Sequence, residues 1–332
     1  MKVLVTGGTG FLGRHVVWRV AAEGAEVTFT GRNAQAANTV IQEAAAPVQW
    51  LSLSHGTPQA EKLLLEAAHG ANAVVHCAAL SAPWGPFVEF VRANVASTAE
   101  VIAACKANGI HRLVHISTPS LYFDFSDRLD ILEEDVLPAP ANDYVRTKQA
   151  AEQLVRSAGL PEVAILRPRA IFGPWDYTLV PRLLRVMAKG HIPLVRGGNI
   201  RMDLTYVANA VEAVWLALTR PLPRALNIYN VTNDEPRSMA ELLQVLAREF
   251  EIPLRTMPVP WPLLREVARA MELKARWCGG AEPLFTRYSA GVLAFSQTLD
   301  VSSLRRDLGW RARVGIDEGI HLHAQWWRDQ HS

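Results

Sequence analysis

Short apolar runs alternate with longer amphipathic segments through the first half of the chain. The runs predict strands at residues 2–6, 26–30, 48–53, 73–76, 112–117 and 163–167. Apolar residues at helical spacing predict helices near residues 11–23, 58–68, 87–108 and 142–158. Because the strands are almost continuously apolar, helices are expected to cover both faces of their sheet. The alternation therefore predicts an α/β fold with a doubly wound parallel sheet.

Beyond residue 170 the pattern is less regular, because frequent prolines divide the chain into short segments. Residues 205–218 and 225–229 still have the pattern of a helix and a strand that return to the sheet. We therefore expect one domain from residues 1–170, to which 203–231 return, and a smaller interleaved domain made mainly of 171–202 and 232–332. The acid-rich stretch 124–135 is expected to be a mobile loop or a solvated turn.

Composition narrows the class of protein. A chain of 332 residues is long enough for about two domains. Its 34 basic and 32 acidic residues leave a net charge of +2, which argues against nucleic acid as a partner. The sequence has no bilayer-spanning apolar run and no secretory signal at its start, so we expect a cytoplasmic protein. Its three widely spaced cysteines fit reduced structural thiols, and no metal site is expected.

The segment TGGTGFLG at residues 6–13 lies between the first predicted strand and the first predicted helix. Gly7 permits a tight turn, Gly10 lets the backbone approach a pyrophosphate, and Gly13 allows the helix to pack closely on the strand. The N-terminal amides of the helix then face the anion. This order of strand, loop and helix predicts a Rossmann-type dinucleotide-binding domain.

The end of the second strand indicates which dinucleotide binds. An acid there would bind the ribose hydroxyls of NAD, whereas an arginine would receive the 2′-phosphate of NADP. The sequence reads Thr30, Gly31, Arg32 and Asn33, without an acid. We therefore favour NADP(H) bound by Arg32 and keep NAD(H) as possible, since a solvated surface arginine would look the same. Arg14 either adds positive charge near the phosphates or is simply exposed.

Tyr144 and Lys148 are four residues apart on the helix that is predicted to begin at Asn142. This spacing puts both side chains on one helical face. An ammonium near a phenol lowers the tyrosine pKa from its usual value of about 10. We expect such a tyrosine to exchange a proton with a substrate oxygen near neutral pH.

Six motifs together make the chain resemble the extended short-chain dehydrogenase/reductase superfamily over nearly its full length. They are TGGTGFLG at 6–13, HCAAL at 76–80, Asn94, HISTPSLY at 115–122, YVRTK at 144–148 and LRPRAIFGP at 166–174. The resemblance implies that Thr118, Tyr144 and Lys148 are catalytic, with Ser117 and Ser120 as alternatives to Thr118. Tyr144 would act as the acid/base, and Lys148 would also bind the nicotinamide ribose.

The same resemblance extends the cofactor site beyond the three glycines and Arg32. It implies contacts from Phe11, Leu12, Ala78, Ala79, Asn94, Pro168 and Ile171, besides Tyr144 and Lys148. Many relatives carry an acid near the end of the third strand that contacts adenine. This chain has Ser52 there, which we expect to be a weaker hydrogen-bonding substitute.

Within the superfamily, two enzyme branches compete. The segments APWG (82–85), LVPRLL (179–184), DLTYVANA (203–210) and YNVTNDEP (229–236) are similar to the 3β-hydroxysteroid-dehydrogenase-like reductases, which include a 2-alkyl-3-oxo acid ketoreductase of bacterial olefin biosynthesis. That branch implies an NAD(P)-dependent oxidoreductase that interconverts a ketone and a secondary alcohol on an apolar, 3-keto acyl or steroid-like substrate. The alternative is a nucleotide-sugar epimerase or dehydratase with tightly bound NAD, in which Arg196 and Arg201 would pair a diphosphate. A non-catalytic dinucleotide-binding regulator is the third hypothesis.

The tryptophan-rich second half is the expected source of the substrate pocket. We take Trp84, Trp175, Leu264 and Trp277 as candidate substrate contacts. The segment 261–277 has helical apolar spacing and is either a cover for the core or a lid whose basic edge touches a membrane surface. Relatives often form homodimers through the tyrosine-bearing helix, so a homodimer is possible here.

Overall fold

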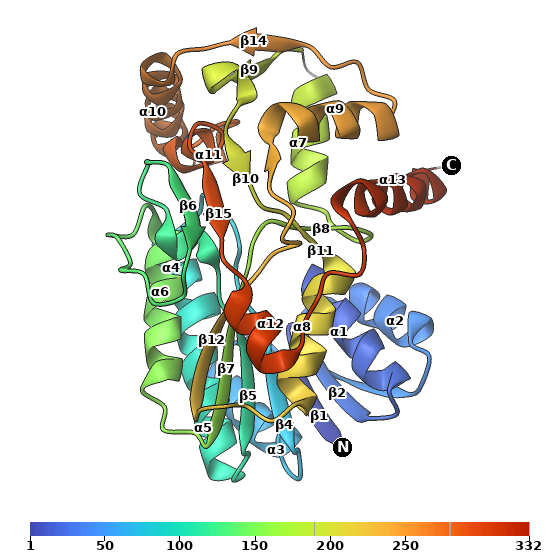
Figure 1. The fold of residues 1–332 in the computed structure, drawn as a ribbon. Helices are drawn as coiled ribbons and strands as arrows, with labels where there is room; N and C mark the ends of the chain where they lie inside the picture. The colour runs from blue at the N-terminus through green and yellow to red at the C-terminus, as the bar shows by residue number, and fades with distance from the viewer. Residues whose placement is uncertain (189, 279, 332) are drawn as a thin grey trace.

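A parallel sheet of seven strands forms the lower part of the molecule in Figure 1, in the order β12-β7-β5-β4-β1-β2-β3. The computed structural model describes residues 1–188, 190–278 and 280–331. The seven strands, in chain order, are β1 (Lys2–Thr6), β2 (Glu26–Gly31), β3 (Val48–Ser52), β4 (Ala73–His76), β5 (Arg112–Ile116), β7 (Glu162–Pro168) and β12 (Leu226–Val231). All six neighbouring pairs are parallel. The expected doubly wound parallel sheet is thus confirmed, and the strand expected near residues 225–229 is its edge strand β12.

Helices cover both faces of this sheet. One face carries α3 (Pro58–Ala67), α5 (Ser97–Ala107) and α6 (Asp143–Arg156), and the other carries α1 (Phe11–Ala22), α2 (Ala34–Glu43) and α8 (Val207–Thr219). Successive residues of a strand point to opposite faces. Accordingly Val3 and Val5 pack in the core under α1 and α8, whereas Leu4 packs under α3 and α5. Because both sets are apolar, the strands are apolar without interruption.

Two helical segments differ from the expectation. The pattern indicated no helix between residues 31 and 48, yet α2 forms there, capped by the Asn33 side chain, which accepts a hydrogen bond from Ala36 N at 3.0 Å. The expected helix at 87–108 is present in three parts, α4 (Phe87–Phe90), a π-helical turn (Val91–Ala96) and α5. The helix expected from Asn142 is confirmed, since the Asn142 side chain accepts from Val145 N at 2.8 Å.

The upper part of the molecule lies over the carboxyl ends of the parallel strands (Figure 1). Its helices are α7 (Leu179–Ala188), α9 (Met239–Glu249), α10 (Trp261–Trp277), α11 (Arg287–Val292) and α13 (Ile316–His331). Helix α12 (Ser302–Leu308) lies lower, against β12 and α8. Its strands are β6 (Arg128–Ile131), β8 (Ile171–Phe172), β9 (Ile192–Leu194), β10 (Arg201–Met202), β11 (Thr205–Tyr206), β13 (Arg237–Ser238), β14 (Thr256–Pro258) and β15 (Gln297–Leu299). They form one sheet of four strands and two sheets of two strands.

The acid-rich stretch 124–135 is not a loop throughout, contrary to the expectation. Its residues Arg128–Ile131 form β6, which pairs with β15 in the order β13-β10-β15-β6. Asp127, just before the strand, accepts from Ser296 N at 2.7 Å and holds the Arg196 side chain in two hydrogen bonds of 2.7 and 2.9 Å. The local sequence does not predict this ordered structure, because the partners of Asp127 come from segments about 70 to 170 residues away.

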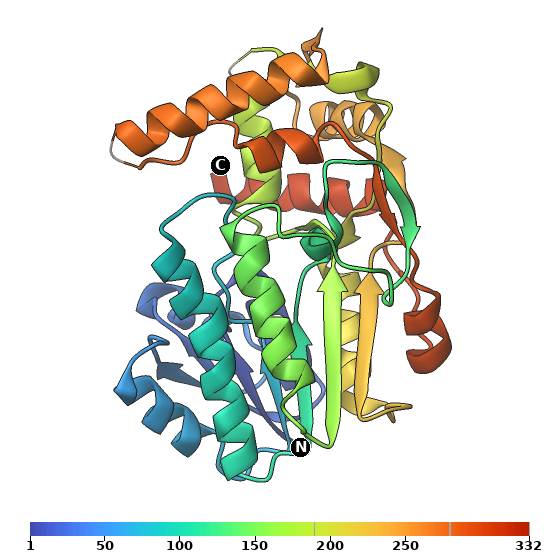
Figure 2. The same ribbon diagram turned by 90° about the vertical axis from the view of Figure 1, so that its left-hand side faces the viewer.

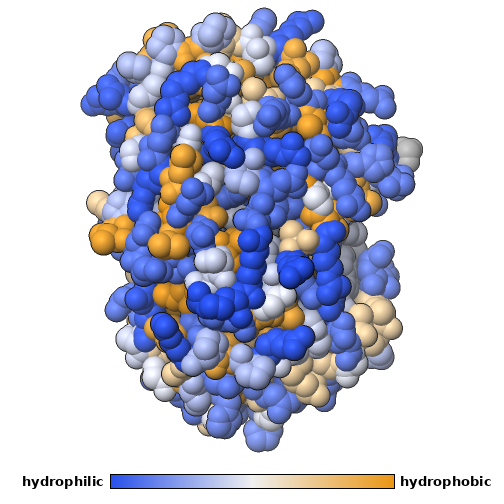
Figure 3. All heavy atoms as spheres, viewed as in Figure 1, coloured by the Kyte–Doolittle hydropathy of each residue, from blue (hydrophilic) through white to orange (hydrophobic). Residues whose placement is uncertain are grey.

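The described residues contain no helix that is both long and apolar enough to cross a membrane. The face drawn in Figure 3 is mainly hydrophilic, with apolar spots scattered over it. Contact of any helix with a membrane surface stays a prediction.

A buried ion pair fastens α6 to β7. The Arg167 guanidinium, which is fully buried, donates to both carboxylate oxygens of Glu152, from Nε at 3.1 Å and from Nη2 in a shorter bond. Glu152 also accepts from the Ser117 hydroxyl at 2.6 Å. Burial opposes ionisation of Glu152, yet the hydrogen bonds from Arg167 and Ser117 leave the pKa of this carboxyl below its ordinary value. The pair is therefore ionised at neutral pH.

We expect Arg167→Met to lower the free energy of unfolding by about 3–5 kcal/mol, because it leaves the Glu152 charge buried without its main partner. Arg156→Met is the matched control, since Arg156 approaches the same carboxylate at 3.6 Å from the surface and should contribute under about 1 kcal/mol. Urea unfolding followed by circular dichroism measures both. Equal losses in the two variants would contradict the assignment.

Candidate active site

The glycine-rich loop connects β1 to α1 at the carboxyl edge of the sheet. Gly7 has φ +69°, and a Cβ there would meet the Ala78 backbone at 2.7 Å. A Cβ on Gly13 would come within 2.2 Å of the Gly7 carbonyl oxygen. Both positions therefore require glycine, and the first turn of α1 lies close to the loop. Gly10, at the N-cap, leaves the amides of this turn without a side-chain cap.

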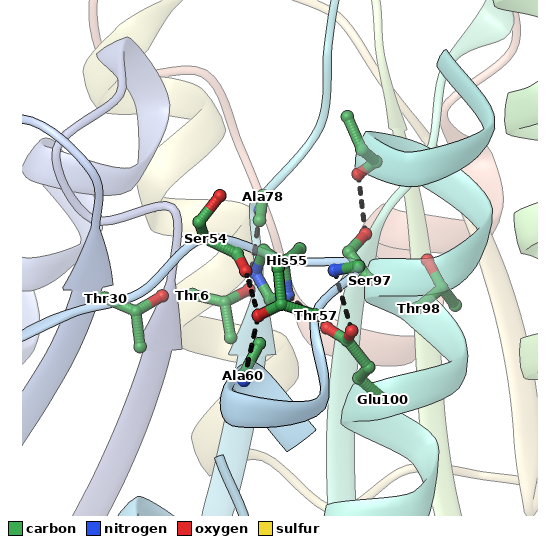
Figure 4. Close-up of polar contacts among 12 residues, drawn as sticks. Thr6, Thr30, Ser54, His55, Thr57, Ala60, Ala78, Ser97, Thr98 and Glu100 are labelled. Atoms are coloured by element: carbon green, nitrogen blue, oxygen red, sulfur yellow. Dashed lines mark hydrogen bonds and ion pairs between the residues drawn. The ribbon is translucent and has the colours of Figure 1, made fainter. Parts of the chain in front are cut away.

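Buried and half-buried polar side chains connect the strand ends next to this loop (Figure 4). The His76 ring bonds the Thr6 hydroxyl at 2.6 Å and the Thr98 hydroxyl of α5 at 3.0 Å. Nearby, Glu100 of α5 bonds the His55 ring at 2.7 Å and accepts from Gly56 N at 2.8 Å. These bonds connect β1, β4, α5 and the segment after β3, which fixes the edge from which the loop projects.

One cavity of about 620 Å³ lies between the carboxyl edge of the sheet and the upper part. Most of the residues expected to act in catalysis or cofactor binding line it: Gly7, Gly10, Phe11, Leu12, Gly13, Ala79, Thr118, Tyr144, Lys148, Pro168 and Ile171. The structure thus brings together in space motifs that are spread over 165 positions of the sequence.

Four residues expected to bind cofactor do not line this cavity. Ala78 supports the Gly7 turn, and buried Asn94 accepts from Leu80 N at 2.7 Å and donates to the Thr147 hydroxyl at 3.0 Å. Arg32 and Ser52 are exposed at the ends of β2 and β3. Arg32 forms no ion pair among the described residues.

The three residues expected to be catalytic come from two neighbouring elements. Thr118 follows β5, and Tyr144 and Lys148 are on the first turns of α6. The hydroxyls of Thr118 and Ser81 act on the Tyr144 phenol in the direction that lowers its pKa. The Lys148 ammonium, 3% exposed, donates to the Ile116 carbonyl oxygen at 2.6 Å.

The expected lowering of the tyrosine pKa is not found. Burial raises the pKa of Tyr144, and the hydroxyls of Thr118 and Ser81 offset only part of that effect. Lys148 faces the Ile116 carbonyl, and its own pKa falls to about 8 because burial disfavours the ammonium. The phenol is therefore protonated at neutral pH.

The roof of the cavity is apolar and comes from the second half of the chain. Its side chains are Leu179, Leu183 and Val186 of α7, Leu242, Leu243 and Leu246 of α9, and Leu284, Phe285, Val292 and Leu293 around α11. Sequence reasoning missed these residues. Their helical spacing on α7 and α9 was the available signal, but such spacing also occurs wherever a helix packs on a core.

Ser120, which the sequence offered as an alternative to Thr118, lies beside it and connects it to Tyr288, which sequence reasoning missed. Ser120 Oγ accepts from the Thr118 hydroxyl at 3.0 Å and from the Tyr288 hydroxyl of α11 at 2.7 Å. No local pattern connects Tyr288 to a serine 168 residues earlier. Ser120 and Tyr288 both line the cavity.

None of the four candidate substrate residues lines the cavity. Leu264 is buried in a cluster with Val195 and Ala290, and Trp277 at the end of α10 is 89% exposed. The segment 261–277 is a helix as expected, but it packs on α11 instead of closing over the cavity.

The two other tryptophans are held elsewhere. Trp84 Nε1 donates to the Gly280 carbonyl oxygen at 2.8 Å. Trp175 lies against Trp326 and under the guanidinium of Arg14, which is 4.4 Å from the ring centroid. Arg14 is itself buried and donates to the Thr9 carbonyl oxygen at 3.0 Å. The alternative that Arg14 is simply exposed is therefore wrong.

Comparison with known proteins gave three kinds of match. Residues 3–232 match the model of the NAD dependent epimerase/dehydratase family. The chain is 36% identical to "Uncharacterized protein YbjS" of Escherichia coli (strain K12), with 99% of this chain and 98% of that protein covered. It is 34% identical to a "2-alkyl-3-oxoalkanoate reductase" of Stenotrophomonas maltophilia, with 96% and 97% covered. A UDP-glucose-4-epimerase structure from Stenotrophomonas maltophilia, with bound NAD, matches at TM-score 0.79 and 22% identity over 100% and 99% of the two chains.

The pKa of Lys148 predicts the pH dependence of activity. Below pH about 8 the Lys148 side chain is a charged ammonium, and above it the amine is neutral. We therefore expect kcat/KM for the reduction to fall as pH rises through that value. Lys148→Arg keeps a positive charge at alkaline pH. The activity that remains in the Lys148→Arg variant should therefore not fall above pH about 8. The same fall of kcat/KM at alkaline pH in wild type and variant would exclude Lys148 as its cause.

Proposed function

The chain belongs to the NAD dependent epimerase/dehydratase family, and from this premise we propose that it is a ketoreductase, which interconverts a ketone and a secondary alcohol on an apolar substrate. Membership confirms the resemblance to the extended short-chain dehydrogenase/reductases, and the chain is an NAD(P)-dependent enzyme of that type. One observation carries the proposal: Thr118, Tyr144 and Lys148 line the same cavity as the glycine loop, under an apolar roof.

The site fits a dinucleotide. The close approaches at Gly7 and Gly13 leave a backbone cradle that side chains would fill, and the uncapped first turn of α1 offers amides to a pyrophosphate. Ala79, Pro168 and Ile171 line the adjoining wall. A bound NAD(P)H supplies the hydride for the reduction.

The protein's own residues then handle the proton and the developing charge. The raised pKa of Tyr144 keeps the phenol protonated, which suits a group that gives its proton to an alkoxide oxygen. Thr118 holds that oxygen by a hydrogen bond. The Lys148 ammonium, four residues along α6, contacts the Ile116 carbonyl in the free protein and would turn from it to stabilise the phenolate once the proton has left. Oxidation of an alcohol follows the same steps in reverse.

The cavity wall supports an apolar substrate over a nucleotide sugar. Arg196, one of two arginines considered for a diphosphate, is occupied by both carboxylate oxygens of Asp127. Neither Arg196 nor Arg201 is among the residues that line the cavity. Of the two arginines that do line the cavity, Arg182 is paired with Glu282, which leaves Arg169 alone to offset the two charges of a diphosphate. The relative named as a 2-alkyl-3-oxoalkanoate reductase supports ketone reduction.

NADPH oxidation in the presence of 3-keto acyl chains, ketosteroids and aromatic ketones tests the function. We expect activity with at least one of these apolar classes. Tyr144→Phe should reduce kcat about 100- to 10,000-fold, because the proton donor is lost while the ring keeps its packing. NADPH binding, measured by fluorescence titration, should remain. Undiminished activity in Tyr144→Phe would refute the proposed proton donor.

We propose that NADP(H) is the preferred cofactor, because exposed Arg32 at the end of β2 has no competing ion-pair partner among the described residues. Arg32→Asp should reverse the ratio of kcat/KM values for NADPH and NADH. Arg265→Asp makes the same charge change on α10, where the side chain pairs with Glu266, and should leave the ratio unaltered. If Arg32→Asp also leaves it unaltered, the NADP(H) assignment is wrong.

A further inference from the structure

Arg169 is a buried cation in the wall of the apolar cavity. It is the first residue after β7, where its backbone N–H donates to the Val231 carbonyl oxygen at 2.9 Å. Arg169 lines the cavity and is 5% exposed, and the two groups that act on its guanidinium, Asp203 and Tyr288, line the same cavity. Removing a guanidinium from water is costly unless an anion or several acceptors replace the water.

No such replacement is found among the described residues. The Nε of Arg169 has no hydrogen-bond partner, and no carboxylate lies within 4.0 Å of the guanidinium. Desolvation accordingly lowers the pKa of Arg169. Two other arginines show the contrast: Arg167 is paired with Glu152, and Arg182, also at the cavity, is paired with Glu282.

The charged and titratable neighbours of Arg169 are Asp203 and Tyr288, which affect it without forming an ion pair within 4.0 Å. Asp203 accepts from Leu299 N at 2.7 Å, and burial raises its pKa to about 6. Tyr288 donates to Ser120. Asp203 therefore attracts the guanidinium from beyond 4.0 Å, but neither residue is its direct ion-pair partner.

Arg169 lies on the side of Thr118 and Tyr144, away from the glycine loop. It follows β7, which is next to β5 and three strands from β1 in the sheet. At about 4.8 Å per strand, this separates it by roughly 14 Å from the strand that carries the loop. Tyr288, its neighbour, shares Ser120 with Thr118. The partner of Arg169 is thus to be sought on the substrate, not on the dinucleotide phosphates.

We propose that Arg169 binds a carboxylate of the substrate, so that the natural substrate is an apolar 3-keto or 3-hydroxy acid and not a neutral ketone. This inference rests on the proposed function. The planar guanidinium matches a carboxylate in two parallel hydrogen bonds, and a single cation is enough for a single negative charge. A neutral substrate would leave the guanidinium buried and unpaired in the complex. Arg169 is therefore a specificity-determining residue.

The test compares an acid with its ester. In the oxidation direction with NADP⁺, 3-hydroxydecanoate and its methyl ester differ at the carboxyl group, and both avoid the spontaneous decarboxylation of 3-keto acids. Wild-type protein should prefer the acid. Arg169→Gln should lower kcat/KM for the acid about 100-fold, mainly through KM, and change the ester little, since a charged hydrogen bond of about 2–3 kcal/mol is lost only with the acid. Arg169→Lys should recover part of the preference.

Arg185→Gln is the matched control, because it removes the same charge from the exposed side of α7. It should leave the acid-to-ester ratio at the wild-type value, which excludes a general effect of net charge. Thermal unfolding adds a readout of a different kind. Arg169→Gln should unfold no lower than wild type, since it removes an unpaired buried charge, whereas loss of a merely structural arginine would lower the melting temperature.

Calorimetric binding of decanoate separates this inference from the proposed function. Decanoate cannot react, and wild-type protein should bind it while Arg169→Gln should not. Equal losses for acid and ester in Arg169→Gln, or a wild type without preference for the acid, would overturn the carboxylate assignment and leave the ketoreductase standing. Binding of decanoate through Arg169 without any turnover of acid, ester or ketone would overturn the ketoreductase and leave the anion site standing.

Discussion

The buried ion pair between Glu152 and Arg167 is the constraint on which the active site depends. Tyr144, Lys148 and Glu152 follow one another at intervals of four along α6, so they share one face of the helix. Pairing Glu152 with β7 therefore fixes the rotation of α6, and with it the direction in which Lys148 and Tyr144 point. The hydroxyl of Ser117, the residue before Thr118, bonds the same carboxylate at 2.6 Å. One buried anion thus sets the relative positions of all three catalytic candidates.

The parts of this arrangement that are local in sequence were predictable. The glycine loop, the spacing of Tyr144 and Lys148 and the apolar strands each depend on residues within a few positions of one another, and the structure brings them together as expected. The roof was not predictable, because Leu183 on α7 and Leu242 on α9 have the same spacing whether they face a core or a cavity. The tryptophans expected to contact substrate lie outside this cavity, which was not predictable for a related reason. Residue type indicates a large apolar surface but not what covers it, and Trp175 is covered by Arg14 and Trp326.

Arg167 and Arg169 show that the local sequence also does not predict which charged residue has an ion-pair partner. They are two positions apart at the end of β7, and both are buried. Arg167 meets Glu152, whereas Arg169 meets no carboxylate among the described residues within 4.0 Å. The sequence LRPRAIFGP does not distinguish them, since the partner that separates the two cases is 15 residues away on a helix. Only the packing of α6 on the sheet determines which arginine is neutralised.

The two sides of the cavity differ in polarity, and this difference determines how its charged groups behave. The sheet edge supplies hydroxyls and an ammonium, which are fixed before any substrate binds, and the second half of the chain supplies apolar surface that excludes water. In such surroundings a hydrogen bond or an ion pair is stronger than in water. The same surroundings keep the Tyr144 phenol protonated. They also remove the water that would otherwise solvate the Arg169 guanidinium, which has no anion in its place. A fold that buries an unpaired guanidinium is less stable than one that does not, and this cost is offset only in the complex with an anion. The burial that destabilises Arg169 in the free protein is therefore the same property that would make it selective for a carboxylate.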